Sequence, residues 1–245
     1  MNHLNWIDQN FKPKYTSPFT WIKTFITIFR WHALRTHALE QIDWNVTRKE
    51  RTATLHGQPI PWWTYASIQF IDQVVPHNAK VLEIGGGNST LYWLNRGNSV
   101  LTLETSPEWI VQILRSTNPV GNQSELVHIV EHSVELITEV LGDRTFDVIV
   151  NDGPDNRIDI ADLLLSRIRP NGMLIWDNSE RPEYHSKIAE IKNKGWHEIS
   201  FFGLGPINAY ASATSIFFST DLIISKTLKT VAVGSKKSLF LKNKS

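Results

Sequence analysis

Three glycines stand directly after a short apolar run, and an acid lies within that run. Residues 80–90 read Lys-Val-Leu-Glu-Ile-Gly-Gly-Gly-Asn-Ser-Thr. The run from Val81 to Ile84 predicts a buried strand, and Asn88 with Ser89 can begin a helix. Glycine lets a backbone approach a ligand closely, and a helix N-terminus offers free N–H groups. The stretch therefore predicts a cradle for a nucleotide-like cofactor.

Acids also stand at the ends of two later apolar runs. Glu104 ends residues 99–104, and Asp152 follows residues 146–151. An acid at the end of the second strand of such a fold can accept hydrogen bonds from both ribose hydroxyls. Ligands of open parallel sheets bind at the carboxyl ends of the strands, so Asp152 is expected to point into the same cleft.

Glu83-x-Gly85-x-Gly87, with Glu104 and Asp152 at these distances, resembles the class I S-adenosylmethionine (SAM) dependent methyltransferases over about residues 62–220. The resemblance implies that Glu83 steadies the glycine loop or the methionine amine of SAM. Gly85 and Gly87 would pass beneath the methionine part, and Glu104 would hold the ribose. The other expected SAM contacts are Asn88, Ser89, Thr105, His132, Ser133 and Asp152.

Asp152, Asp177 and Asn178 form a second constellation at two neighbouring strand ends. Their spacing resembles the divalent-metal site of the catechol and caffeoyl-coenzyme A O-methyltransferases. Carboxylate and amide oxygens suit Mg²⁺ or another hard divalent cation. In that family the metal lowers the pKa of a substrate hydroxyl. The alternative is that Asp177 and Asn178 only cap the turn before Ser179.

The general base of that family has no counterpart here. The catechol-type enzymes carry a lysine shortly after the first acid, whereas residues 153–157 read Gly-Pro-Asp-Asn-Arg. Arginine stays protonated and is a poor base. The expected catalytic residues are therefore Asp152, Asp155 and His185, with a metal-bound hydroxide as another possible base.

Composition and charge narrow the class of protein. The 245 residues are 41% hydrophobic and include no cysteine, which excludes global disorder, disulfides and thiolate metal sites. Residues 1–60 carry a net charge of +4, residues 61–220 of −8 and residues 221–245 of +5. An acidic body of this kind argues against nucleic-acid binding. Polar residues 1–14 show no signal peptide, so a cytoplasmic protein is expected.

Residues 18–41 are helical in pattern, apolar and aromatic, but Lys23, Arg30 and Arg35 interrupt them. They are too short an uncharged run to span a membrane. They predict either an interfacial helix or a helix packed on the domain or on a second subunit, and packing is preferred. The basic ends of the chain could contact anionic lipid or a partner; solvated termini are the alternative. The oligomeric state is left open.

Strands alternate with helices five times, and an antiparallel pair follows at 196–202 and 215–219. This pattern predicts an α/β Rossmann-like, doubly wound and mostly parallel seven-stranded sheet with an antiparallel edge pair and helices on both faces. We expect an N-terminal helical extension over 1–60, a SAM-binding domain over 61–220, and a basic tail or hairpin over 221–245. A helix from Trp62 is expected before the first strand, and its start, 62–65, could contact the ligand.

The predicted function is methyl transfer from SAM to an oxygen, or less readily a nitrogen, of a small molecule or glycan, with or without a divalent metal. One alternative is an NAD(P)-dependent oxidoreductase, although Thr90 replaces the third glycine of a dinucleotide fingerprint. The other is a non-catalytic binding module of the same fold, acting at a membrane or on a partner.

Overall fold

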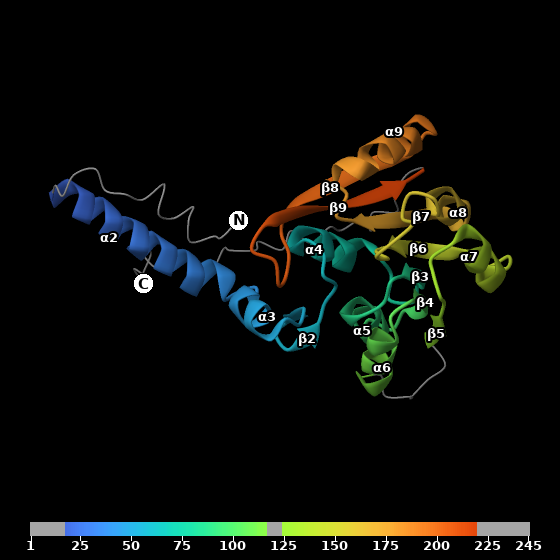
Figure 1. Ribbon diagram of the computed structural model, residues 1–245, viewed down its shortest axis with the longest axis horizontal. Helices are drawn as coiled ribbons and strands as arrows, with labels where there is room; N and C mark the ends of the chain where they lie inside the picture. The colour runs from blue at the N-terminus through green and yellow to red at the C-terminus, as the bar shows by residue number, and fades with distance from the viewer. Residues whose placement is uncertain (1–17, 117–123, 220–245) are drawn as a thin grey trace, which may run out of the picture.

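The computed structural model describes residues 18–116 and 124–219 (Figure 1). A seven-stranded sheet lies at the centre, in the order β5-β4-β3-β6-β7-β9-β8. Its strands are β3 (Lys80–Ile84), β4 (Ser99–Glu104), β5 (Ser124–His128), β6 (Phe146–Asn151), β7 (Ile168–Asp177), β8 (His197–Leu204) and β9 (Ala211–Phe218). The first five are parallel, and β9 runs antiparallel to β7 and β8. The predicted Rossmann-like sheet with an antiparallel edge pair is confirmed.

Alternating side chains of the strands point to opposite faces, because successive residues of a strand alternate. Val81 packs with α4 and α5 in one apolar cluster, whereas Leu82 and Ile84 pack with α7, α8 and α9 in the other. The helices of the domain are α4 (Tyr65–Val74), α5 (Asn88–Asn95), α6 (Pro107–Ser116), α7 (Val134–Leu141), α8 (Ala161–Ser166), the 3₁₀ helix η2 (Pro182–Tyr184) and α9 (His185–Asn193). Both faces are thus covered, and the strand order reverses direction between β3 and β6.

Several element boundaries differ from expectation; β9, for example, begins at Ala211 rather than at residue 215. The helix expected from Trp62 begins at Tyr65, because Thr64 at its N-cap has an extended backbone. Residues 169–172 read Arg-Pro-Asn-Gly, which predicts a turn, but they lie within β7, where the pairing with β6 shifts register near Phe146 and Asn171 has a φ of 65°. A left-handed asparagine therefore bends a continuous strand that the Pro-Asn-Gly sequence alone suggests should stop.

The N-terminal extension contains α2 (Pro18–Ala33), the π-helix η1 (Leu34–Leu39), α3 (Trp44–Glu50) and the hairpin of β1 (Thr54–Leu55) and β2 (Gln58–Pro59). Its second half packs on the domain: Trp44 is buried and donates from Nε1 to the carbonyl of Asn208 at 2.9 Å. Its first half, α2, projects away from the body (Figure 1). None of the helices in the described ranges is both long and apolar enough to traverse a bilayer.

Candidate cofactor and acceptor site

The glycine loop is held tightly between β3, β4 and β6. Gly85 has a φ of +84°, a backbone conformation that favours glycine. A Cβ added there would lie 2.8 Å from the carbonyl oxygen of Asp152. The Gly85 N–H donates to the carbonyl of Leu103 at 2.9 Å, and the Gly87 N–H donates to Thr90 Oγ1 at 3.1 Å. The loop therefore lies at the point where the strand order reverses, which is the usual ligand position in open α/β sheets.

Glu83 lies fully buried beneath this loop. Its Oε2 accepts hydrogen bonds from the hydroxyls of Thr90 and Thr102, whereas its Oε1 has no hydrogen-bond partner in good geometry among residues 18–116 and 124–219. The Ser89 hydroxyl also acts on this carboxyl and lowers its pKa, as those of Thr90 and Thr102 do. Burial raises the pKa of the Glu83 carboxyl to about 7. A buried carboxylate oxygen without a donor is costly, so this atom fits a cationic ligand group.

Glu104 connects the glycine loop to the end of β4. Its Oε2 accepts from the Gly86 N–H at 2.6 Å, and its Oε1 accepts from the Ser106 N–H at 2.6 Å. A carboxylate offers about four lone-pair positions, so two remain for further donors. The side chain is almost completely buried and is fixed in orientation before any ligand binds.

His132 and Asp155 meet at the same edge of the sheet. Nδ1 of the buried His132 ring lies 2.6 Å from Oδ1 of Asp155, and its Nε2 lies 3.3 Å from the carbonyl of Leu103. The ring also packs on Gly153, where an added Cβ would lie 2.8 Å from Nδ1. The Asp155 side chain is 44% exposed and is therefore accessible from solvent.

Asp152 is held by an arginine and a tryptophan. Arg157 donates from Nη2 to Asp152 Oδ1 at 2.8 Å, and the buried Trp63 donates from Nε1 to Oδ2 at 3.2 Å. The same guanidinium donates to the carbonyls of Gly153 at 2.5 Å and Asp177 at 2.6 Å. Arg157 therefore links the loop that follows β6 to the end of β7.

The expected metal ligands are engaged by other groups. Asp177 accepts from Thr214 Oγ1 at 2.6 Å, and Asn178 Oδ1 accepts from Arg181 Nη2 at 3.0 Å. Burial and the negative charge of Asp152 raise the pKa of Asp177 well above its ordinary range. Two guanidinium groups, of Arg157 and Arg181, act on Asp152.

These contacts do not fit a divalent cation, because a cation there would displace guanidinium groups from their oxygen partners or be repelled by them. Within residues 18–116 and 124–219, no three or more His, Cys, Asp or Glu side chains come together as a metal-binding group. The local charge on Asp152 is balanced by Arg157 instead.

The other expected site residues are more scattered. Asn88 donates from Nδ2 to the carbonyl of Ala53 at 2.7 Å and thereby ties α5 to the extension. Ser89 is buried in the first turn of α5, and Ser133 caps α7 by accepting from the Leu136 N–H at 3.4 Å. The Thr105 carbonyl contacts the ring of His128.

His185 lies beside the segment that follows β7. Its Nε2 lies 3.1 Å from the carbonyl of Glu180, and it lines a cavity of about 490 Å³ that α9 and β8 border. None of the contacts recorded for it reaches Asp152 or the glycine loop.

The start of α4 completes the site. Trp63 is fully buried against Trp93, while the Thr64 N–H donates to Thr214 Oγ1 at 3.1 Å. Trp62, by contrast, is 41% exposed. Of residues 62–65, which were expected to contact the ligand, Trp63 hydrogen-bonds to Asp152, the acid that follows β6.

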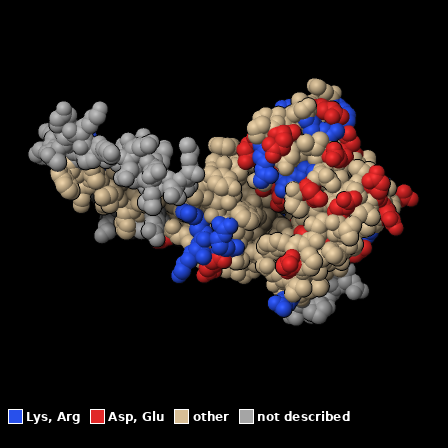
Figure 2. Space-filling model, viewed as in Figure 1, with Lys and Arg blue, Asp and Glu red and all other residues tan. Residues whose placement is uncertain are grey.

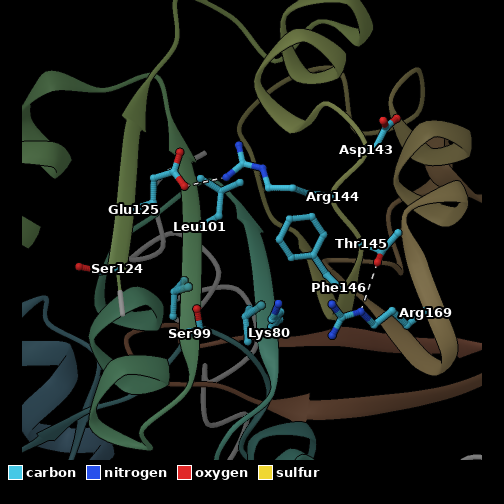
Figure 3. Close-up of a pocket in the computed structure, with 12 residues that line it drawn as sticks. Lys80, Ser99, Leu101, Ser124, Glu125, Asp143, Arg144, Thr145, Phe146 and Arg169 are labelled. Atoms are coloured by element: carbon cyan, nitrogen blue, oxygen red, sulfur yellow. Dashed lines mark hydrogen bonds and ion pairs between the residues drawn. The ribbon is translucent and has the colours of Figure 1, made fainter. Parts of the chain in front are cut away.

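Another cavity, of about 410 Å³, lies at the opposite, amino-terminal edge of the sheet (Figure 3). Its two arginines are paired: Arg144 with Glu125 at 2.6 Å, and Arg169 with Asp147 at 3.2 Å. Lys80, which begins β3, lines this cavity, whereas Gly85 follows the other end of that strand. The cavity is therefore separate from the glycine loop and its acids.

Arg157 and Thr214 are the site residues that sequence reasoning missed as partners of the acids. Arg157 stands five residues after Asp152, but its pairing depends on how the loop turns back. Thr214 lies opposite Asp177 in the antiparallel register of β7 and β9, and only the strand pairing reveals it.

Comparison with known proteins supports the fold through structures rather than sequences. No family model matches the chain, and no curated protein sequence matches it. An O-methyltransferase from Bacillus cereus in complex with SAH superposes with a TM-score of 0.50 at 16% identity, covering 88% of this chain and 96% of that one. A methyltransferase from Pyrococcus furiosus gives 0.51 at 16% identity, covering 75% and 100%.

A Staphylococcus aureus protein assigned as a caffeoyl-CoA O-methyltransferase gives a TM-score of 0.52 at 15% identity, covering 79% of this chain and 100% of that one. At these identities the comparisons establish architecture. The chain therefore has the fold of the class I SAM-dependent methyltransferases.

Proposed function

We propose that the protein transfers the methyl group of SAM to an oxygen of a small molecule or glycan. The observation that carries this proposal is the Oε1 of Glu83, which is fully buried beneath the glycine loop and accepts no hydrogen bond from the part of the chain that the structure describes. The amine of the methionine part of SAM is a cationic donor of the kind this oxygen lacks. Neighbouring Glu104 has lone pairs left for the ribose hydroxyls.

SAM supplies a sulfonium methyl group, which moves to the acceptor by in-line displacement. The protein contributes mainly the positions of the two reactants and the exclusion of water. Gly85 brings the backbone of the loop close to the end of β6, so the methionine part would lie beside Asp152. Asp152 positions Trp63, and Arg157 positions Asp152.

The acceptor hydroxyl needs a proton acceptor, and Asp155 is the best placed of the three candidates. Asp152 is already engaged by Arg157 and Trp63, and His185 lies in a different cavity. Asp155 is 44% exposed at the carboxyl edge of the sheet and is held by the buried ring of His132. In this proposal Asp155 takes the proton, and no step uses a metal ion.

Isothermal titration with SAM, with SAH and with NADH tests the cofactor assignment. We expect SAM and SAH to bind and NADH not to bind. The variant Glu104→Gln should lower the affinity for SAM at least about tenfold, because it replaces a charged hydrogen-bond acceptor with a neutral one. Absence of SAM binding to the full-length protein would overturn the proposal. Binding of NADH in its place would favour the oxidoreductase.

Methyl transfer to the acceptor requires a separate assay. SAH release from SAM with a panel of phenols, hydroxy acids and glycans would identify the acceptor class, with Asp155→Asn as the test variant and Asp159→Asn, also exposed, as its control. Loss of a general base lowers the rate about 10²- to 10⁴-fold. SAM binding with an unchanged rate in Asp155→Asn would refute the role of Asp155.

A further inference from the structure

Helix α2 exposes an apolar half that nothing in the described chain covers. Its residues Trp21, Ile22, Phe25, Ile26, Ile28 and Phe29 are all exposed, with Trp21 at 72% and Phe25 at 71%. With 3.6 residues per turn, these six side chains fall on one half of the helix. Lys23, Thr24, Thr27 and Arg30 fall on the other half, which also carries the exposed side chain of Trp31.

Such a face is unusual on a soluble domain, because contiguous apolar patches are normally buried or used for binding. Figure 1 shows α2 projecting from the body, so its apolar half does not rest on the sheet or its helices. The helix contains Lys23, Arg30 and His32 and no acid. An amphipathic helix with Trp and Phe on one face and cations on the other is typical of helices that lie in the plane of a membrane surface.

A second cluster of positive charge lies close to α2. Arg48, Lys49 and Arg51 are exposed at the end of α3, and Arg48 stacks on the ring of Trp44 at 4.7 Å. In Figure 2 a compact basic patch lies between the projecting helix and the body, whereas acids are spread over the body. Residues 61–220 carry a net charge of −8, so an anionic surface would attract the extension and repel the body.

We propose that α2 lies in the surface of an anionic lipid bilayer, with its apolar half in the acyl boundary and with Lys23, Arg30 and the end of α3 at the headgroups. A second copy of the chain is the less favoured occupant. Symmetric pairing through this face would place the same basic residues of two copies side by side. Lipid phosphates and carboxylates neutralise those charges.

Flotation of the full-length protein with vesicles tests the proposal. We expect the protein to float with phosphatidylcholine vesicles that contain phosphatidylserine, and to float less when the phosphatidylserine is omitted or the salt is raised. The double variant Phe25→Asp with Phe29→Asp should lower the affinity for these vesicles at least about tenfold. It removes two aromatic side chains that the proposal places in the acyl boundary.

The matched control is Thr24→Asp with Thr27→Asp. It adds the same two negative charges to the other half of the same helix, so it should retain most of the binding. The proposal is overturned if the full-length protein does not float, or if the two double variants lose binding equally. It is also overturned if light scattering shows a dimer that Phe25→Asp with Phe29→Asp dissociates, because the face would then belong to a second copy.

Discussion

Arg157 Nη2 lies 2.8 Å from Oδ1 of Asp152, and the same guanidinium reaches the backbone carbonyls of Gly153 and Asp177. This one side chain joins the ends of β6 and β7 and neutralises an acid at the carboxyl edge of the sheet.

Replacing Arg157 with Ala should destabilise the fold strongly. The variant leaves Asp152 without its cationic partner and frees two buried carbonyls, which costs about 3–5 kcal/mol of unfolding free energy. Arg169→Ala is the control, because Arg169 pairs with Asp147 across a partly exposed surface and should cost no more than about 1 kcal/mol. Urea unfolding measures both, and equal losses would contradict the structural role of Arg157.

Removal of divalent metals should leave the protein unchanged. Asp152, Asp177 and Asn178 already bond to Arg157, Thr214 and Arg181, respectively. EDTA is therefore expected to alter neither the melting temperature nor the SAM affinity. Calorimetric titration with Mg²⁺ should show no stoichiometric binding. If instead one ion bound per chain, and Asp177→Asn abolished that binding, the metal-site hypothesis would be supported.

Glu83→Gln should flatten the pH dependence of stability. The pKa of Glu83 rises from 4.5 to about 7 on folding, so the folded state binds this proton more tightly than the unfolded state. Its contribution is fully present below pH 4.5 and is lost as the pH rises through about 7, a difference of roughly 3 kcal/mol. Urea unfolding at several pH values should show this decline in the parent protein and a smaller one in the variant.

The control for that experiment is Glu108→Gln. The Ser106 hydroxyl lowers the pKa of Glu108, so Glu108 does not contribute to a decline between pH 4.5 and 7. If Glu83→Gln kept the full decline, the proton would belong to another group.

Gly85→Ala should lower the affinity for SAM much more than Gly57→Ala does. Both glycines have positive φ, +84° and +75°, so alanine strains either turn by about 1–3 kcal/mol. At Gly85 the new Cβ also lies 2.8 Å from the Asp152 carbonyl, whereas at Gly57 nothing lies within 4 Å. We expect at least about a tenfold loss of SAM affinity for Gly85→Ala alone. Calorimetric titration compares them, and equal losses would separate the glycine loop from SAM binding.

Much of the fold was predictable from local sequence. Apolar runs that end in Glu104 or in Asp152 identify buried strands and their carboxyl ends, and the three glycines after Ile84 identify the turn. The register shift within β7 could not be predicted from the sequence, because Pro170 and Gly172 are typical of a turn. Only the pairing with β6 shows that the chain continues as a strand.

The site was predictable in outline but not in its pairing. Glu83, Glu104 and Asp152 were expected at one edge of the sheet because parallel strands carry them there. The predicted metal site depended on the spacing of Asp152 and Asp177 in the sequence. That spacing does not show which hydrogen-bond donors surround the two carboxylates in the fold. Thr214 is 37 residues from Asp177 in the chain, and no local pattern connects the two.

The extension is fixed to the domain at two points, one of them in the helix that follows the glycine loop. Asn88, in the helix that follows the glycine loop, holds the carbonyl of Ala53, and Trp44 holds the carbonyl of Asn208. A displacement of the extension would therefore reach the first turn of α5. By thermodynamic reciprocity, if lipid alters the affinity for SAM through this linkage, SAM must alter the affinity for lipid by the same factor.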